Sequence, residues 1–215
     1  GLPDLGGRIG FAPAAGSAEA ERAVPEVVRA PTAVLREGRE SVVGAWPALC
    51  WAGFSAALTS IATSSPSLGG LVWVSLVPLL IASVRVRPRV GAGIGGAFGL
   101  ILTIGAAPWF SGMVARYFGV SHLVGWAAHL VCAVLVVSVW IGGFTAWLAW
   151  AAQRGPVSPV LVGAAWALFE AARIQFSGGI PWALSSAGID AAGVIAQASL
   201  LAGPLAPALL VGTVN

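Results

Sequence analysis

Two charged side chains stand out in the apolar stretch between Trp166 and Trp182. Glu170 and Arg173 are three residues apart, so on a helix they share a face, where a carboxylate and a guanidinium can pair. A charged group within a bilayer is costly, and its presence there favours a functional explanation. The alternative is a structural ion pair, which is tolerable because the long Arg side chain can extend toward the membrane surface. In the functional interpretation, the pair anchors the turn in the segment that follows or meets a lipid headgroup beneath a site in the outer leaflet.

That segment contains residues suited to a sharp turn at a membrane surface. Gly178 and Gly179 permit a break after the helix, because glycine adopts backbone conformations closed to other residues. Pro181 then fixes the chain direction, and Trp182 is expected at the level of the lipid headgroups. The predicted lipid-proximal or structural site comprises Glu170, Arg173, Gly179, Pro181, Trp182 and Gln197.

The remaining candidates for chemistry are few. His122 and His129 are separated by about 10 Å along a helix axis, too far to share one metal ion. We expect His122 at the membrane interface and His129 deeper, hydrogen-bonded to a neighbouring helix. Cys50 and Cys132 lie in different apolar segments and are expected to be small buried residues. With no HExxH, CxxC or GxSxG motif, the sequence predicts no metal, no cofactor and no catalytic residue on this chain.

The composition excludes a water-soluble domain. Hydrophobic residues make up 58% of the 215 residues, and only 9% are charged. A soluble domain carries roughly a quarter charged residues. The net charge of +3 comes from scattered Arg residues without a basic face, which argues against a nucleic-acid partner. The chain is therefore predicted to be an integral membrane protein.

Apolar segments of bilayer length divide the chain. Spans of about 17–25 residues are typical of transmembrane helices, and a longer one can tilt. The segments are 42–62, 68–84, 90–107, 123–150 and 157–176, with part of a sixth at 205–215. We therefore predict an all-α, polytopic transmembrane bundle of five full helices and a truncated sixth over residues 42–215. Residues 1–41 are polar and are predicted to be a disordered N-terminal arm.

The distribution of Arg predicts the orientation. With the N-terminus in the cytoplasm, nine of the eleven basic residues lie on the cytoplasmic side, and only Arg116 and Arg173 lie outside. Positive residues concentrate on the cytoplasmic side of membrane proteins. The inner set comprises the five Arg of residues 1–41 with Arg85, Arg87, Arg89 and Arg154. The chain is thus predicted to be N-in.

A glycine strip marks the third segment. Gly91, Gly95 and Gly99 recur every four residues and give a smooth face for close packing of another helix. A pore or hinge is the alternative interpretation.

From Trp166 onward, the motifs of this sequence resemble those in the membrane domain of apolipoprotein N-acyltransferase, a bacterial enzyme of lipoprotein maturation. That family shows a helix of the form W-x3-E-x2-R, then G-x-P-W, then Q-x-A-x3-G and an apolar helix ending in Asn. The matching positions are Trp166, Glu170, Arg173, Gly179, Pro181, Trp182, Gln197, Ala198, Gly203 and Asn215. The resemblance covers residues 45–215.

The resemblance implies an activity and its partners. In that family a nitrilase-like domain with a Glu–Lys–Cys triad follows a seventh helix. Its Cys takes an acyl chain from a phospholipid as a thioester and passes it to the amino group of a diacylglyceryl-cysteine on a lipoprotein. This sequence has no Lys, and we expect it to be inactive alone, as the membrane part of such an enzyme in the bacterial inner membrane.

Two other functions stay open at the sequence level. The chain could be a non-catalytic scaffold that holds a polyprenol-phosphate mannose synthase or another partner at the membrane. It could also be a small transporter built on the glycine-rich third segment, but such a path would need polar residues at mid-membrane, where His129 is nearly alone.

Overall fold

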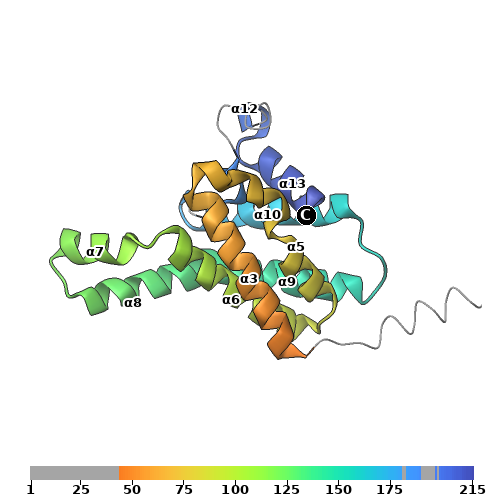
Figure 1. Cartoon of the computed structure of the whole chain (residues 1–215), viewed down its shortest axis with the longest axis horizontal. Coiled ribbons are helices and arrows are strands. Elements are labelled where there is room, and N and C mark those ends of the chain that lie inside the picture. Colours follow the sequence, from red (N-terminus) through yellow and green to blue (C-terminus); the bar gives the residue numbers. More distant parts are fainter. Residues whose placement is uncertain (1–43, 181–182, 190–196, 198) are drawn as a thin grey trace, which may run out of the picture. The chain divides into compact units, whose positions relative to one another are not determined.

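The computed structural model describes residues 44–180, 183–189, 197 and 199–215. All regular structure in this part of the chain is helical, as predicted (Figure 1). The predicted arm, residues 1–41, lies outside the described residues, and its boundary and disorder stay predictions.

The long helices follow the predicted apolar segments, whereas shorter ones form between them. In chain order the helices are α3 (Ala45–Ser64), the 3-10 helix η2 (Pro66–Leu71), α4 (Val72–Ser75), α5 (Val77–Val84), α6 (Pro88–Ala106), α7 (Phe110–Phe118), α8 (His122–Cys132), the π-helical segment η3 (Ala133–Ser138), α9 (Val139–Ala152), α10 (Pro159–Phe176), the 3-10 helix η4 (Ser185–Gly188), α12 (Ser199–Ala202) and α13 (Leu205–Val214). Of these, α7, η4 and α12 form between the apolar segments.

Four helices in the described residues are long and apolar enough to cross a membrane. They are Ala45–Ser64, Ser67–Val84, Pro88–Ala106 and His122–Ala152. The second of these spans combines η2, α4 and α5, and the fourth combines α8, η3 and α9. The multi-pass, all-α class is thereby confirmed. The expected fifth crossing is α10, an 18-residue helix that contains Glu170 and Arg173, and the expected sixth begins as α13. The full number of crossings and the N-in orientation stay predictions.

The glycine strip of α6 is a packing face, as expected. A Cβ on Gly95 would lie 2.0 Å from Thr145 Oγ1 and 2.7 Å from the Ile141 carbonyl oxygen, so only glycine fits against α9. The Thr145 hydroxyl in turn donates a 2.7 Å hydrogen bond to the Gly91 carbonyl. Close backbone approach and an interhelical hydrogen bond together stabilise this pair of helices.

The second apolar segment is interrupted at Leu76. In an uninterrupted helix, the Leu76 N–H would donate a hydrogen bond to the Val72 carbonyl. Here α4 ends at Ser75 and Leu76 is a turn residue. The side-chain amide of Asn215 occupies the gap: Leu76 N donates to its Oδ1 at 2.8 Å, and its Nδ2 donates to the Val72 carbonyl at 3.0 Å. No local pattern in the sequence predicts this contact between distant segments.

Helices α7 and α8 lie side by side as a hairpin (Figure 1). Between them is a small apolar cluster of Ala107, Phe110 and Val114, packed with Met113, Ala128 and Cys132. Cys132 is therefore half-buried, close to expectation. Cys50 is exposed, so its expected burial is wrong. It lies on the face of α3 opposite the buried Ala48, Ala52 and Ala56.

Candidate functional site

Helix α10 presents Trp166, Glu170 and Arg173 on its buried face, because steps of four and three residues bring side chains to one side of a helix. The helix begins at Pro159, where a missing N–H costs nothing. The side chain of Ser158 caps this end by accepting a 3.2 Å hydrogen bond from Leu161 N. Burial places both charged groups inside the protein and away from the surrounding lipid.

The Glu170 carboxylate is held by the segment that follows α10. Its Oε1 accepts a 2.9 Å hydrogen bond from the backbone N–H of Ser185, and its Oε2 accepts one of 3.2 Å from the Ser185 hydroxyl. The same hydroxyl accepts a 3.1 Å hydrogen bond from Trp166 Nε1. Bonds to a charged acceptor are among the stronger ones in proteins. The three side chains thus fix the start of η4 against α10.

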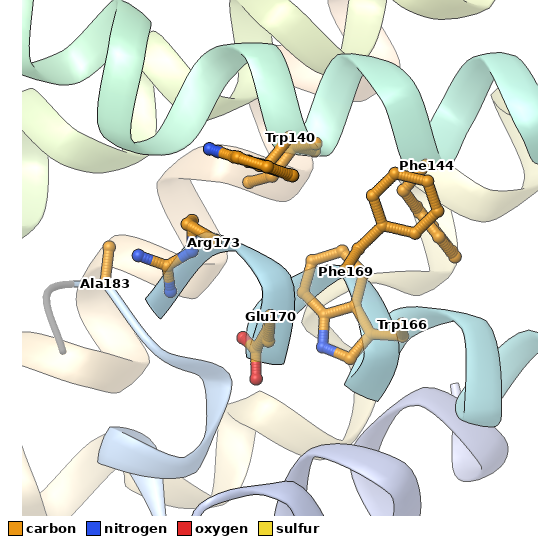
Figure 2. Close-up of a pocket in the computed structure, with 8 residues that line it drawn as sticks. Trp140, Phe144, Trp166, Phe169, Glu170, Arg173 and Ala183 are labelled. Atoms are coloured by element: carbon orange, nitrogen blue, oxygen red, sulfur yellow. The ribbon is translucent and has the colours of Figure 1, made fainter. Parts of the chain in front are cut away.

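Arg173 is 2% exposed and interacts electrostatically with Glu170 across one helical turn. Figure 2 shows its guanidinium pointing toward Ala183, whereas the Glu170 carboxylate points away from Ala183. Both side chains line a small cavity beneath the rings of Trp140, Phe144, Trp166 and Phe169, with room for about one water molecule. The cavity is too small for an organic cofactor.

The break after α10 has the geometry that its glycines allow. Gly178 and Gly179 have φ values of 72° and 89°, in the region that disfavours other residues. The Gly179 N–H donates to the Ile174 carbonyl at 2.8 Å and so caps the helix end. Ala183 also has a positive φ of 53°. The chain therefore turns back within a few residues and brings Ser185 to Glu170.

The other three predicted site residues are Pro181, Trp182 and Gln197. Pro181 and Trp182 lie outside the described residues. Gln197 is exposed and is not among the residues that line the cavity. The predicted Gly179 shapes the break, and Glu170 and Arg173 lie at the cavity.

Two contributors were missed by sequence reasoning. Ser185 holds the carboxylate, and Trp140 of α9 covers the cavity. The serine could not be found from spacing, because its position depends on the positive-φ turn between it and α10. Trp140 is one of ten Trp in the chain and carries no distinguishing pattern.

His129 is buried but does not form the hydrogen bond that the sequence led us to expect. The backbone of Thr103 lies close to the ring, yet neither ring nitrogen has hydrogen-bond geometry with a partner in the described residues. The imidazole stacks on Trp126 at 5.6 Å between ring centroids and lies 5.1 Å from the Phe110 ring. It therefore acts as a packing element of the α7–α8 hairpin.

The chemistry available to this arrangement is positional. Each carboxylate oxygen of Glu170 accepts a hydrogen bond from Ser185, and Arg173 lines the cavity together with four aromatic side chains. Within the described residues, no group of three His, Cys, Asp or Glu side chains is placed to hold a metal ion. The site is suited to holding a loop at the end of a membrane helix.

Comparison with known proteins supports a family assignment. No match is found among curated proteins. The family model described as the apolipoprotein N-acyltransferase N-terminal domain matches residues 55–215, a range that includes α10, the glycine break and Asn215. Since this match covers most of the chain, the protein belongs to the apolipoprotein N-acyltransferase family, through its N-terminal membrane domain.

Proposed function

We propose that this chain is the membrane-embedded part of an enzyme that transfers an acyl chain from a phospholipid to the N-terminal diacylglyceryl-cysteine of lipoproteins. The family match supports the reaction class, and the apolar helices support a setting in which both lipid substrates are at hand. The bacterial inner membrane is the proposed location. The acyl donor and the acceptor both reach the protein from within the bilayer.

The observation that carries the proposal is the buried Glu170 carboxylate bound to Ser185. A buried charge is costly unless it is paired or hydrogen-bonded, so retaining one here must serve a purpose. We infer that the purpose is to hold Ser185 and the start of η4 against the end of α10. There they form part of the floor on which the acyl-transfer site rests, and Arg173 supports the same loop from the other side.

The nucleophile of the reaction is not proposed on this chain. A thioester-forming Cys needs a base and a polar surrounding that favours the thiolate. Cys50 is exposed on α3 and Cys132 packs in the apolar cluster of the hairpin. The chain contains no Lys to assist either of them. Residues 1–215 are therefore proposed to be inactive by themselves.

The experiment is to remove the gene that encodes this chain from its host and to analyse the N-terminal peptides of lipoproteins by mass spectrometry. Loss of the triacylated form and accumulation of the diacylglyceryl form with a free amine is the expected result. Unchanged N-acylation in the deletion strain, with no second gene of this family in the host, would exclude the proposal.

Variants separate the role of the site from that of the fold. Re-expression of the gene with Glu170→Ala should restore less triacylated lipoprotein than the wild-type gene at equal membrane abundance. Leu168→Ala, on the exposed side of the same helix, is the matched control and should restore it fully.

A further inference from the structure

The α7–α8 hairpin has a surface that its own packing does not use. The interior of the hairpin is closed by Phe110 and Val114, and the helices approach so closely that a Cβ on Gly125 would meet the Ser111 carbonyl oxygen at 2.3 Å. The outward side chains are nevertheless large and apolar. Tyr117 and Leu123 are each 79% exposed, and Phe118, Val124 and Trp126 are also exposed. Large apolar side chains that are exposed together at one end of a hairpin indicate an interaction site.

The length of the helices indicates what this surface meets. The continuous span His122–Ala152 has 31 residues, which corresponds to about 46 Å. The hydrocarbon core of a bilayer is about 30 Å thick, and the whole bilayer with its headgroup layers is about 40–45 Å thick. The span is therefore matched to the full bilayer, whereas the 19 residues of α6 cover only the hydrocarbon core.

The two ends of the long span carry groups typical of an interface. At one end the Arg154 guanidinium lies 3.6 Å from the centroid of the Trp150 ring, an amphipathic pair suited to a headgroup layer. With that end in one headgroup layer, α8 begins in the opposite one. The hairpin tip there combines exposed Tyr117 and Trp126 with exposed Arg116 and His122.

This combination favours the headgroup layer over its two neighbours. Water would leave the rings of Tyr117 and Phe118 and the side chain of Leu123 uncovered. The hydrocarbon core would desolvate Arg116, which is costly. In the headgroup layer the rings lie among the upper acyl segments, and Arg116 can meet lipid phosphate as a charged donor.

We propose that the α7–α8 hairpin tip, residues 115–126, is a lipid-binding arm that is embedded in the headgroup layer at its end of the membrane. Its occupant is phospholipid: acyl segments and glycerol backbones cover Tyr117, Phe118 and Leu123, and headgroup phosphate binds Arg116. This surface is separate from the Glu170 cavity and does not depend on the proposed acyl transfer.

The test is a depth measurement on the full chain in phospholipid vesicles. Single Cys residues are placed at Tyr117 and Leu123 in a background with Cys50→Ser and Cys132→Ser, and each is labelled with a nitroxide. Because both positions are highly exposed, the substitutions leave the packing intact. The accessibility of each label to oxygen and to a water-soluble nickel chelate is then measured by power saturation. Leu135→Cys, exposed within the span, and Pro156→Cys, in the loop after Arg154, give the limits for hydrocarbon and for water.

Embedding predicts a ratio of oxygen to nickel accessibility at Tyr117 and Leu123 that is several-fold above that at Pro156 and below that at Leu135. A ratio equal to that at Pro156 would show that the tip stands in water and would overturn the proposal. Low accessibility to both reagents would also overturn it, because it would show a protein surface over the tip. Removal of the charge by Arg116→Gln should shift both labels when anionic lipid is present, and the absence of any shift would overturn the assignment of phosphate to Arg116.

Discussion

The backbone N–H of Ser185 donates to the carboxylate of Glu170 at 2.9 Å and so joins two segments that are separated by the Gly178–Gly179 break. Both groups are buried, and the Ser185 hydroxyl adds a second bond to the same carboxylate. A buried donor that loses its acceptor pays its full desolvation cost. The position of Ser185 and the start of η4 should therefore depend on the Glu170 side chain.

Glu170→Ala is expected to lower the free energy of unfolding by about 1–3 kcal/mol, because it leaves the buried Ser185 N–H without an acceptor. Ser185→Ala keeps the backbone bond but removes the hydroxyl that accepts from Trp166 Nε1, so its cost should be about 1–2 kcal/mol. Denaturant unfolding in detergent measures both values, and proteolysis within residues 177–189 reports on the loop. Equal costs for the two variants would contradict the importance of the backbone bond.

The sequence was informative where the signal was periodic. Apolar segments of bilayer length predicted the membrane helices, and the four-residue glycine spacing predicted the packing face of α6. The three-residue spacing of Glu170 and Arg173 predicted that they share a face, because the geometry of a single helix determines the direction of both side chains.

Contacts between segments that the fold brings together could not be predicted from the sequence. The Ser185–Glu170 bonds depend on a turn in which, among the described residues, Gly178, Gly179 and Ala183 have positive φ values. Asn215 and Leu76 are 139 residues apart, and no local pattern connects them. The expected hydrogen bond of His129 is not formed, because the imidazole packs against the rings of Phe110 and Trp126 and the nearby Thr103 backbone lacks hydrogen-bond geometry with it.

Asn215 is expected to stabilise the interruption of the second apolar segment. Its amide both accepts from Leu76 N and donates to the Val72 carbonyl, so it supplies the two groups that the helix lacks there. Asn215→Leu should cost about 1–3 kcal/mol, because both groups lose a partner. Asn215→Asp keeps an acceptor but no donor and should fall between Leu and wild type.

The midpoint of thermal denaturation in detergent would rank these Asn215 variants. Val214→Ala is the control, since Val214 is exposed and adjacent. A midpoint for Asn215→Leu equal to that of the control would mean that the two backbone groups find other partners.

Gly95 and Gly93 form a matched pair for the packing of α6 on α9. A methyl group at Gly95 would overlap Thr145 Oγ1 and the Ile141 carbonyl, whereas one at Gly93 would meet nothing within 4 Å. Gly95→Ala should therefore destabilise the protein by about 1–3 kcal/mol through overpacking. Gly93→Ala should be neutral or stabilising by up to about 1 kcal/mol, because alanine favours the helix. If unfolding in detergent showed the same effect for both, the two helices would not pack as closely as described.

The glycine break after α10 tests backbone strain separately from packing. Gly179 has a φ of 89°, and a Cβ there would meet no atom within 4 Å, so a substitution is opposed by conformation alone. Gly179→Ala should cost about 1–2 kcal/mol, the penalty for a left-handed conformation in a residue with a Cβ. Gly155→Ala is the control, since Gly155 also has open space around it but no positive φ. Because the turn at Gly179 brings Ser185 to Glu170, Gly179→Ala should also increase cleavage within residues 177–189 by an added protease. A variant that lost stability without any increase in cleavage would show that the turn and the Glu170–Ser185 bonds are independent.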